Sequence, residues 1–183
     1  TSMRVKLPSG QKEQVQLSTH QKKLKAFCEE NRFILSFDSW IPTNYFGSFK
    51  GFKHVDIRRT TALVTGVYAG VRFEYYECVA YDTINMLEYD LNIIGVDLMN
   101  RKVSKFMMQR ESKLTAVIDF VLKNQVSISD RAKFNSMYSI YSRDKEKTAE
   151  IFSGEMIDYL EENDLKDRII EGDGDSKVIL YEN

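Results

Sequence analysis

The last third of the chain constrains the fold most, because three kinds of periodicity follow one another there. Residues 134–141 favour a strand, which ends at the turn 142–144. Residues 145–162 have the apolar spacing of an amphipathic helix, and residues 169–181 are typical of a hairpin that turns at 172–174. The helix positions expected to cover a sheet are Phe152, Met156, Tyr159 and Leu160. A strand, a helix and a hairpin in this order indicate an α+β fold.

The helix in this region is predicted to be broken. Asp144 is a good N-cap for a helix that begins at Lys145, since its carboxylate can accept a backbone N–H of the first turn. Ser153 can cap a second helical turn that begins at Gly154. Two short helices are therefore expected in place of one continuous helix.

The first half of the chain predicts one helix and three strands. Residues 18–21, Ser-Thr-His-Gln, are typical of a capping box, so a helix is expected to begin there. Residues 33–37 favour a strand, and residues 61–68 and 71–81 favour a hairpin with a two-residue turn at 69–70. Apolar side chains occur on both faces of the second hairpin strand, which suits a central position in a sheet.

The segment 84–110 allows two interpretations. A strand is favoured by Leu91, Ile93 and Ile94, whereas a helical stripe is formed by Met99, Val103, Phe106 and Met107. Residues 114–122 alternate and favour a further strand. We predict a polar N-terminal segment, 1–17, whose first three residues look like a cloning remnant. A single α+β domain follows over 18–183, a mostly antiparallel sheet on which the N-terminal and broken C-terminal helices pack.

The composition agrees with one sheet-rich domain in a reducing compartment. The 183 residues include 11 Phe and 10 Tyr but only 2 Pro, and no 18 apolar residues stand together. The 2 Cys lie in different predicted elements, which favours a reduced, cytoplasmic chain. The net charge of −1 divides into alternating basic and acidic blocks, which can attract one another in the folded chain.

Two stretches resemble a broad family of uncharacterised bacterial proteins, many of which carry membrane segments before a soluble domain. Residues 58–73 are similar to the family's pattern of arginine, glycine, small turn and aromatic strand, and residues 134–160 to its strand, Ser-x-Asp turn and helix. The chain has Ser153-Gly154 where the family usually has Thr-Pro, and residues 84–112 have no counterpart. The resemblance implies the fold and, with an upstream anchor, a place at the inner face of a membrane. It implies no activity.

Candidates for catalysis are few. His54 lies beside Asp56 in a predicted loop, and an Asp–His pair can orient an imidazole for proton transfer, so a hydrolase-type enzyme with His54 as base is one alternative. His20 is predicted to be structural, on the first turn of the helix. No Gly-x-Ser-x-Gly motif occurs, and Cys28 and Cys78 are expected to be buried thiols. A noncatalytic domain is therefore favoured.

Metal and phosphate sites are also weakly indicated. Glu171, Asp173 and Asp175 place three carboxylates near a turn, where they could bind a hard cation. The other ligand positions of a calcium loop are missing, so a solvated turn is the favoured interpretation. Gly66 and Gly70 lack the Gly-Lys-Ser/Thr ending of a phosphate loop and predict a turn and a close strand approach. No metal or cofactor is predicted.

Residues 50–57 partly match the strand motif by which one family of domains binds single-stranded RNA. Lys50, Gly51, Phe52 and Val55 agree with that motif, but His54 stands where an aromatic ring should stack. The predicted order of elements, with a helix first, also differs from that fold. RNA binding by a strand over 50–56 is therefore an alternative, and nucleic acid is not the favoured partner.

The loop 44–59 is the leading candidate for binding an unidentified protein or small ligand. Aromatic side chains alternate there with basic ones, a composition that often marks interfaces. The predicted binding residues are Tyr45, Phe46, Phe49, Lys50, Phe52, Lys53, Arg58 and Arg59. The competing interpretation is that the phenylalanine rings of this loop belong to the core.

Overall fold

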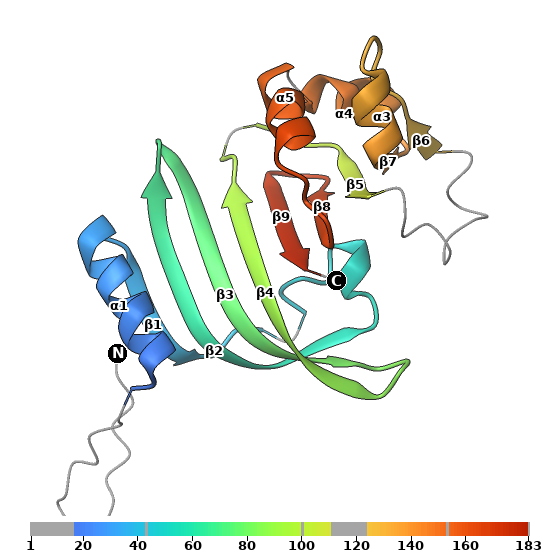
Figure 1. Cartoon of the computed structure of the whole chain (residues 1–183). Coiled ribbons are helices and arrows are strands. Elements are labelled where there is room, and N and C mark those ends of the chain that lie inside the picture. The colour runs from blue at the N-terminus through green and yellow to red at the C-terminus, as the bar shows by residue number, and fades with distance from the viewer. Residues whose placement is uncertain (1–16, 43, 100, 111–123, 153, 183) are drawn as a thin grey trace, which may run out of the picture.

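An antiparallel sheet of nine strands organises the computed structural model, which describes residues 17–42, 44–99, 101–110, 124–152 and 154–182 (Figure 1). The strands lie in the order β1-β2-β3-β4-β9-β8-β5-β7-β6. Their bounds are β1 Ile34–Ser39, β2 Val55–Tyr68, β3 Val71–Asp82, β4 Leu87–Asp97, β5 Lys105–Arg110, β6 Gln125–Val126, β7 Tyr138–Ser142, β8 Arg168–Asp173 and β9 Lys177–Glu182. The helices are α1 Thr19–Asn31, α3 Ala132–Met137, α4 Lys145–Ile151, α5 Gly154–Glu162 and the short 3-10 helix η1 Lys50–Phe52. The predicted single α+β domain is confirmed.

The four α-helices of the described residues lie on the same face of the sheet, at its two ends. Tyr75, Ile94 and Leu180 are cross-strand neighbours on β3, β4 and β9, so their side chains share a face. Tyr75 and Ile94 lie beneath α1, while Leu180 packs against the core cluster built by α3, α4 and α5. Figure 1 shows α1 beside β1 and β2, and the other three helices gathered at the opposite end.

A loop covers the other face. Tyr76, Ile93 and Tyr181 are cross-strand neighbours on that face, and Phe46 and Phe52 from the segment before β2 pack on them. The loop therefore replaces a second helical layer and completes a second core cluster.

The predictions for the N-terminal half are confirmed. Ser18 accepts a hydrogen bond from the Gln21 amide, and the Gln21 side chain accepts one from the Ser18 amide, so the capping box is present. The hairpin of β2 and β3 turns at Ala69 and Gly70, whose φ angles are 49° and 79°. Two successive positive φ angles match the right-handed twist of the strands, and glycine adopts them without strain.

The strand predicted over 134–141 is wrong in its first half. Ala132–Met137 forms α3, and only Tyr138–Ser142 is the strand β7. Asn135 explains the helical turn, because its side chain bonds both the N–H and the C=O of Ile128, at 3.0 and 2.7 Å. Phe134 then enters the core from the helix and is fully buried.

The remaining predictions for the last third have mixed outcomes. The helix breaks between α4 and α5, and Asp144 caps α4 through the Lys147 amide, as expected. Ser153 lies outside the described residues, so its cap stays a prediction. The closing hairpin is confirmed, but Gly172 lies within β8 and the turn follows it at 174–176. Glycine is needed at position 172 because a Cβ there would lie 2.7 Å from the Phe106 ring.

The segment 84–110 forms two strands, so the helical interpretation of its second part is wrong. β4 pairs with β3 and β9, and β5 pairs with β7 and β8. Phe106 and Met108 are two residues apart on β5, and both are buried in the core cluster built by α3, α4 and α5. A strand requires this spacing, because every second side chain points to the same face. The strand predicted over 114–122 and residues 1–16 of the predicted polar segment lie outside the described residues.

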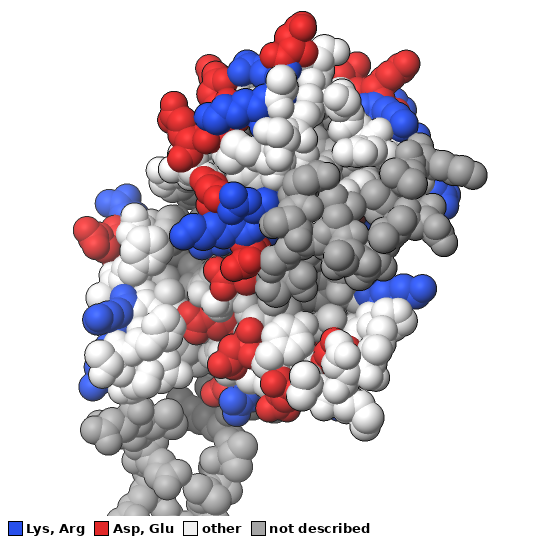
Figure 2. All heavy atoms as spheres, turned by 45° about the vertical axis from the view of Figure 1, so that its right-hand side comes forward, with Lys and Arg blue, Asp and Glu red and all other residues white. Residues whose placement is uncertain are grey.

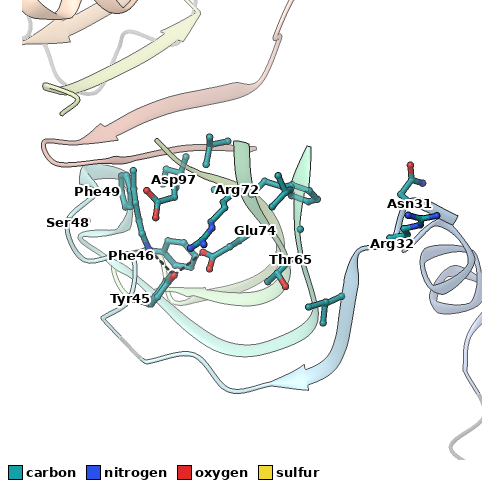
Figure 3. A pocket seen from close by; sticks show the side chains of 18 residues that line it. Asn31, Arg32, Tyr45, Phe46, Ser48, Phe49, Thr65, Arg72, Glu74 and Asp97 are labelled. Atoms are coloured by element: carbon teal, nitrogen blue, oxygen red, sulfur yellow. Dashed lines mark hydrogen bonds between the residues drawn. The ribbon is translucent and has the colours of Figure 1, made fainter. Parts of the chain in front are cut away.

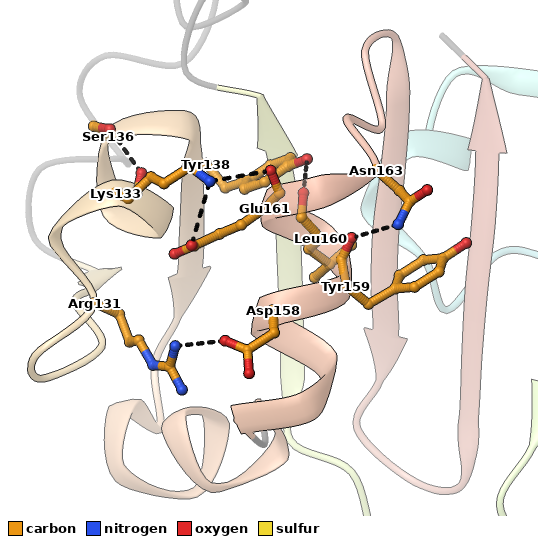
Figure 4. Close-up of polar contacts among 9 residues, drawn as sticks. All are labelled: Arg131, Lys133, Ser136, Tyr138, Asp158, Tyr159, Leu160, Glu161 and Asn163. Atoms are coloured by element: carbon orange, nitrogen blue, oxygen red, sulfur yellow. Dashed lines mark hydrogen bonds and ion pairs between the residues drawn. The ribbon is translucent and has the colours of Figure 1, made fainter.

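Oppositely charged blocks of the sequence attract each other in the fold, as predicted. Arg131 pairs with Asp158 at 2.6 Å and Lys133 with Glu161 at 3.6 Å, so basic α3 lies against acidic α5 (Figure 4). Figure 2 shows Lys and Arg beside Asp and Glu on one face of the molecule. Each pair has at least one well-exposed side chain, so each contributes little to stability.

Tyr138 supports a stability prediction. Its buried hydroxyl donates to the Leu160 carbonyl at 3.0 Å (Figure 4). It also accepts a hydrogen bond from the Leu165 amide at 3.1 Å. Tyr138→Phe leaves both backbone groups unpaired, so we expect it to lower the free energy of unfolding by about 2 kcal/mol. Urea denaturation measures this, with Tyr159→Phe as control, because Tyr159 is 61% exposed on α5. Equal midpoints for the two variants would contradict the prediction.

None of the described helices has the length and apolar character that crossing a bilayer requires. Cys28 and Cys78 are both buried and free, as predicted. Burial raises the pKa of the Cys78 thiol to about 11, which keeps it protonated and unreactive near neutral pH.

Candidate functional site

A cavity of about 670 Å³ opens where β2, β3, β4 and β9 meet the loop before β2 (Figure 3). We call it the Tyr45 cavity. Two cross-strand rows build its floor. The first row is Arg72, Asp97 and Lys177, and the second is Glu74, Gly95 and Ile179. Because Gly95 has no side chain, the floor is hollow at the centre of the second row.

Glu74 is the polar centre of the cavity. Its Oε2 atom accepts hydrogen bonds from the hydroxyls of Tyr45, at 2.9 Å, and Tyr76, at 2.7 Å. Burial, together with the hydrogen bonds to Tyr45 and Glu74, raises the pKa of Tyr76 well above its ordinary value. The Tyr76 hydroxyl therefore stays protonated, and the two hydrogen bonds hold the Glu74 carboxylate in one orientation.

Lys177 is tied to the same network. Its Nζ donates to the Tyr45 hydroxyl at 2.9 Å and lies 4.7 Å from the centre of the Tyr45 ring. Burial lowers the pKa of Lys177, but the hydrogen bond to Tyr45 and the charges of Glu74 and Asp97 outweigh it, so the pKa is raised. Lys177 is a fixed positive charge at one wall of the cavity.

Arg72 differs from Glu74, Asp97 and Lys177 because its side chain has unused hydrogen-bond donors. Its cross-strand neighbour Asp97 accepts the Met99 amide at 2.7 Å, and the described residues provide no hydrogen bond or ion pair to the Arg72 side chain. Figure 3 shows Arg72 pointing toward Glu74 and Tyr45. A guanidinium held in a concave site with unused donors is suited to bind a carboxylate or phosphate through two hydrogen bonds.

Of the two interpretations of the phenylalanines before β2, the exposed one is wrong and the one that places them in the core is confirmed. Phe46, Phe49 and Phe52 are only 4, 3 and 6% exposed. The Phe49 amide donates to the Phe46 carbonyl and the Phe52 amide to the Phe49 carbonyl, so successive tight turns place all three rings on one side. Phe46 and Phe49 also line the Tyr45 cavity together with Tyr45, whereas Phe52 does not.

The basic members of the predicted binding set do not converge on this cavity. Lys53 and Arg59 are exposed elsewhere, and the Arg58 guanidinium lies 4.5 Å from the centre of the Tyr81 ring. Lys50–Phe52 forms η1 and not a strand, so the strand over 50–56 that the RNA-binding alternative requires is wrong. The Lys50 amide instead donates to a carboxylate of the sheet.

That carboxylate belongs to Glu171, which was expected at a solvated turn. Glu171 is 1% exposed and accepts hydrogen bonds from the Lys50 and Gly51 amides and the Tyr181 hydroxyl, at 2.6, 2.9 and 2.6 Å. Asp173 does lie at the turn, where it accepts the Asp175 and Lys177 amides. In the described part of the chain, no group of three or more His, Cys, Asp or Glu is placed to hold a metal ion.

The two histidines lie apart from the Tyr45 cavity. His54 is exposed and lines a small hollow of about 170 Å³ with Asp82 and Glu182. Asp56 and Arg59 do not line that hollow, and among the described residues His54 and Asp56 share no hydrogen bond. His20 lies 2.7 Å from Glu77 and connects α1 to β3.

The sequence interpretation missed Arg72, Glu74, Asp97 and Lys177. Arg72 and Glu74 are two residues apart at the start of an aromatic strand, and this spacing signals two charges on one face. Asp97 and Lys177 end and begin their strands, and only the order of the sheet places them beside Arg72.

Comparisons with known proteins bear on the fold alone. No family model matches the chain, and a search of curated proteins finds no significant match, so the family resemblance stays a prediction. Among solved structures, the fold is similar to that of the mycobacterial trehalose monomycolate transport factor A, TtfA. The TM-score is 0.53 at 9% identity, over 88% of this chain and 80% of that one.

Proposed function

We propose that this chain is a noncatalytic binding domain whose Tyr45 cavity holds a small molecule with an anionic group. The observation that carries the proposal is the Arg72 guanidinium, which lies in the cavity with unused hydrogen-bond donors. Lys177 adds a second positive charge at the wall, and Glu74 already accepts two tyrosine hydroxyls. Arg32 also lines the cavity, so three cationic side chains face the two carboxylates of Glu74 and Asp97, and the net charge attracts an anion.

The absence of catalysis in this proposal rests on the lining of the cavity. The lining includes neither His nor Cys, and the hydroxyl of its one tyrosine, Tyr45, already donates to Glu74. The fold similarity to a transport factor agrees with a binding role without chemistry. A cytoplasmic position at the inner face of a membrane, as the family resemblance implies, belongs to the same proposal.

Arg72→Gln tests the proposal. Ligand-detected NMR with succinate, glutamate and inorganic phosphate should show binding to the native chain. The variant should bind roughly ten- to a hundredfold more weakly, because a charged hydrogen-bond pair is lost. Binding of succinate or glutamate alone identifies a carboxylate ligand, and binding of phosphate alone identifies a phosphate ligand.

Arg59→Gln is the matched control, since Arg59 is exposed on β2 and does not line the cavity. It should bind like the native chain. Equal affinities of the Arg72 and Arg59 variants, or no binding by any of the three probes, would overturn the proposal.

A further inference from the structure

A second hollow, of about 580 Å³, lies on the opposite face of the sheet between α1 and the strands β3 and β4. We call it the α1 groove. Phe73, Ile94 and Val96 form part of its floor, and Leu24 and Phe27 form its helical wall. Phe27 is 52% and Ile94 41% exposed, so large apolar side chains face solvent inside a concave site. Concave apolar surface of this kind is typical of ligand sites.

One end of the α1 groove is polar and acidic. Glu77 lies there, within 2.7 Å of His20 Nε2, and accepts the Tyr75 hydroxyl at 3.1 Å. A neighbouring hollow of about 300 Å³ shares these three residues with the groove and adds Asp90 and Asn92. Glu77 pairs with Asn92 and Val79 with Asp90 across β3 and β4, so the two hollows follow one another along β3.

The two hollows together have the length and polarity of an amphiphile site. From Val71, at the apolar end, to Glu77 the strand advances six residues, or about 20 Å at the rise of an extended chain. An alkyl chain laid along this path covers the exposed apolar side chains. Its head then lies at the Glu77 and Asp90 carboxylates, which accept hydrogen bonds and repel negative charge.

We propose that the α1 groove binds a single-chain amphiphile with a cationic head group that donates hydrogen bonds, such as an ammonium, because Glu77 and Asp90 place two carboxylates at the polar end. The charge at its polar end is opposite to that around Arg72 in the Tyr45 cavity. The proposal is therefore independent of the function proposed for that cavity, and each can fail without the other.

Three probes with the same alkyl chain test the head group: dodecyl maltoside, dodecylammonium and laurate. Calorimetric titration below their micelle concentrations should show one dodecylammonium bound per chain, with higher affinity than dodecyl maltoside. The heat capacity change should be negative, as burial of apolar surface requires. Laurate should bind at least about tenfold more weakly, because its carboxylate faces two others. Tighter binding of dodecyl maltoside than of dodecylammonium would overturn the proposal of a cationic head group.

Ile94→Trp tests the location, because the larger side chain fills the floor of the groove from a partly exposed position. This substitution should lower the affinity for dodecylammonium by roughly tenfold or more. Leu87→Trp is the control, since Leu87 is 63% exposed on the same strand and lines neither hollow. Circular dichroism and thermal midpoints of the two variants show whether both are folded.

Asp90→Lys is a second test that leaves the apolar floor intact. It should lower the affinity for dodecylammonium and raise the affinity for laurate, each by about tenfold, because the charge beside the head group is reversed. Tight laurate binding by the native chain, or equal affinities of the Trp variants, would overturn the proposal. So would sedimentation showing a dimer that Ile94→Trp dissociates while no probe binds, because a second copy would then occupy the groove.

Discussion

Replacing Glu171 by alanine is expected to lower the free energy of unfolding by about 4 kcal/mol, since three buried donors lose their acceptor. The donors are the Lys50 and Gly51 amides and the Tyr181 hydroxyl. They come from η1 and β9, so the carboxylate fastens the loop before β2 to the sheet. Urea denaturation should show a lower midpoint with an unchanged slope.

Two variants make this measurement specific. Glu182→Ala, on the neighbouring strand β9, removes an exposed carboxylate and should change stability by less than about 0.5 kcal/mol. Gly51→Ala should be as harmful as Glu171→Ala, because its Cβ would collide with the Tyr181 hydroxyl. A Glu171→Ala variant as stable as Glu182→Ala would show that the loop is held by its rings alone.

Replacing Phe46, Phe49 and Phe52 together by alanine is expected to unfold the domain. Each ring is buried, and truncation of a buried phenylalanine costs about 3–5 kcal/mol. Three such losses approach or exceed the whole stability of a typical domain, about 5–15 kcal/mol. Circular dichroism and a thermal scan should show no cooperative transition.

Trp40→Ala is the control for this variant. Trp40 is 83% exposed and lies in the same connection between β1 and β2, so its loss should leave the thermal midpoint nearly unchanged. A folded triple variant with a native transition would contradict the placement of the three rings in the core. It would also restore the loop 44–59 as an exposed interface.

The phenylalanine loop shows how one composition supports opposite interpretations. Rings alternating with basic residues predicted a surface, whereas the spacing of three residues between Phe46, Phe49 and Phe52 is the period of tight turns. That spacing can be recognised in the sequence. It predicts that the three rings lie on the same side of the loop, but only the position of the sheet decides whether that side is buried.

The candidate sites were harder to predict than the fold, because their residues are distant in sequence. Of the predicted binding residues, Tyr45, Phe46 and Phe49 do line the Tyr45 cavity. Arg72, Asp97 and Lys177 join them only because β3, β4 and β9 are neighbours in the sheet. Glu171 was assigned to a solvated turn since its own neighbours are polar. Its partners Lys50 and Gly51 lie about 120 residues away.

The sequence by itself determined the local structure: the capping box at Ser18, the turn at Ala69 and Gly70, the break between α4 and α5, and the alternation of the long strands. These features depend on hydrogen bonds and side-chain periods within a few residues, so they can be recognised in a single sequence. The tertiary structure alone decided the strand order, the face covered by each helix and the two hollows. Those features depend on pairing and burial between distant segments, for which local periodicity carries no information.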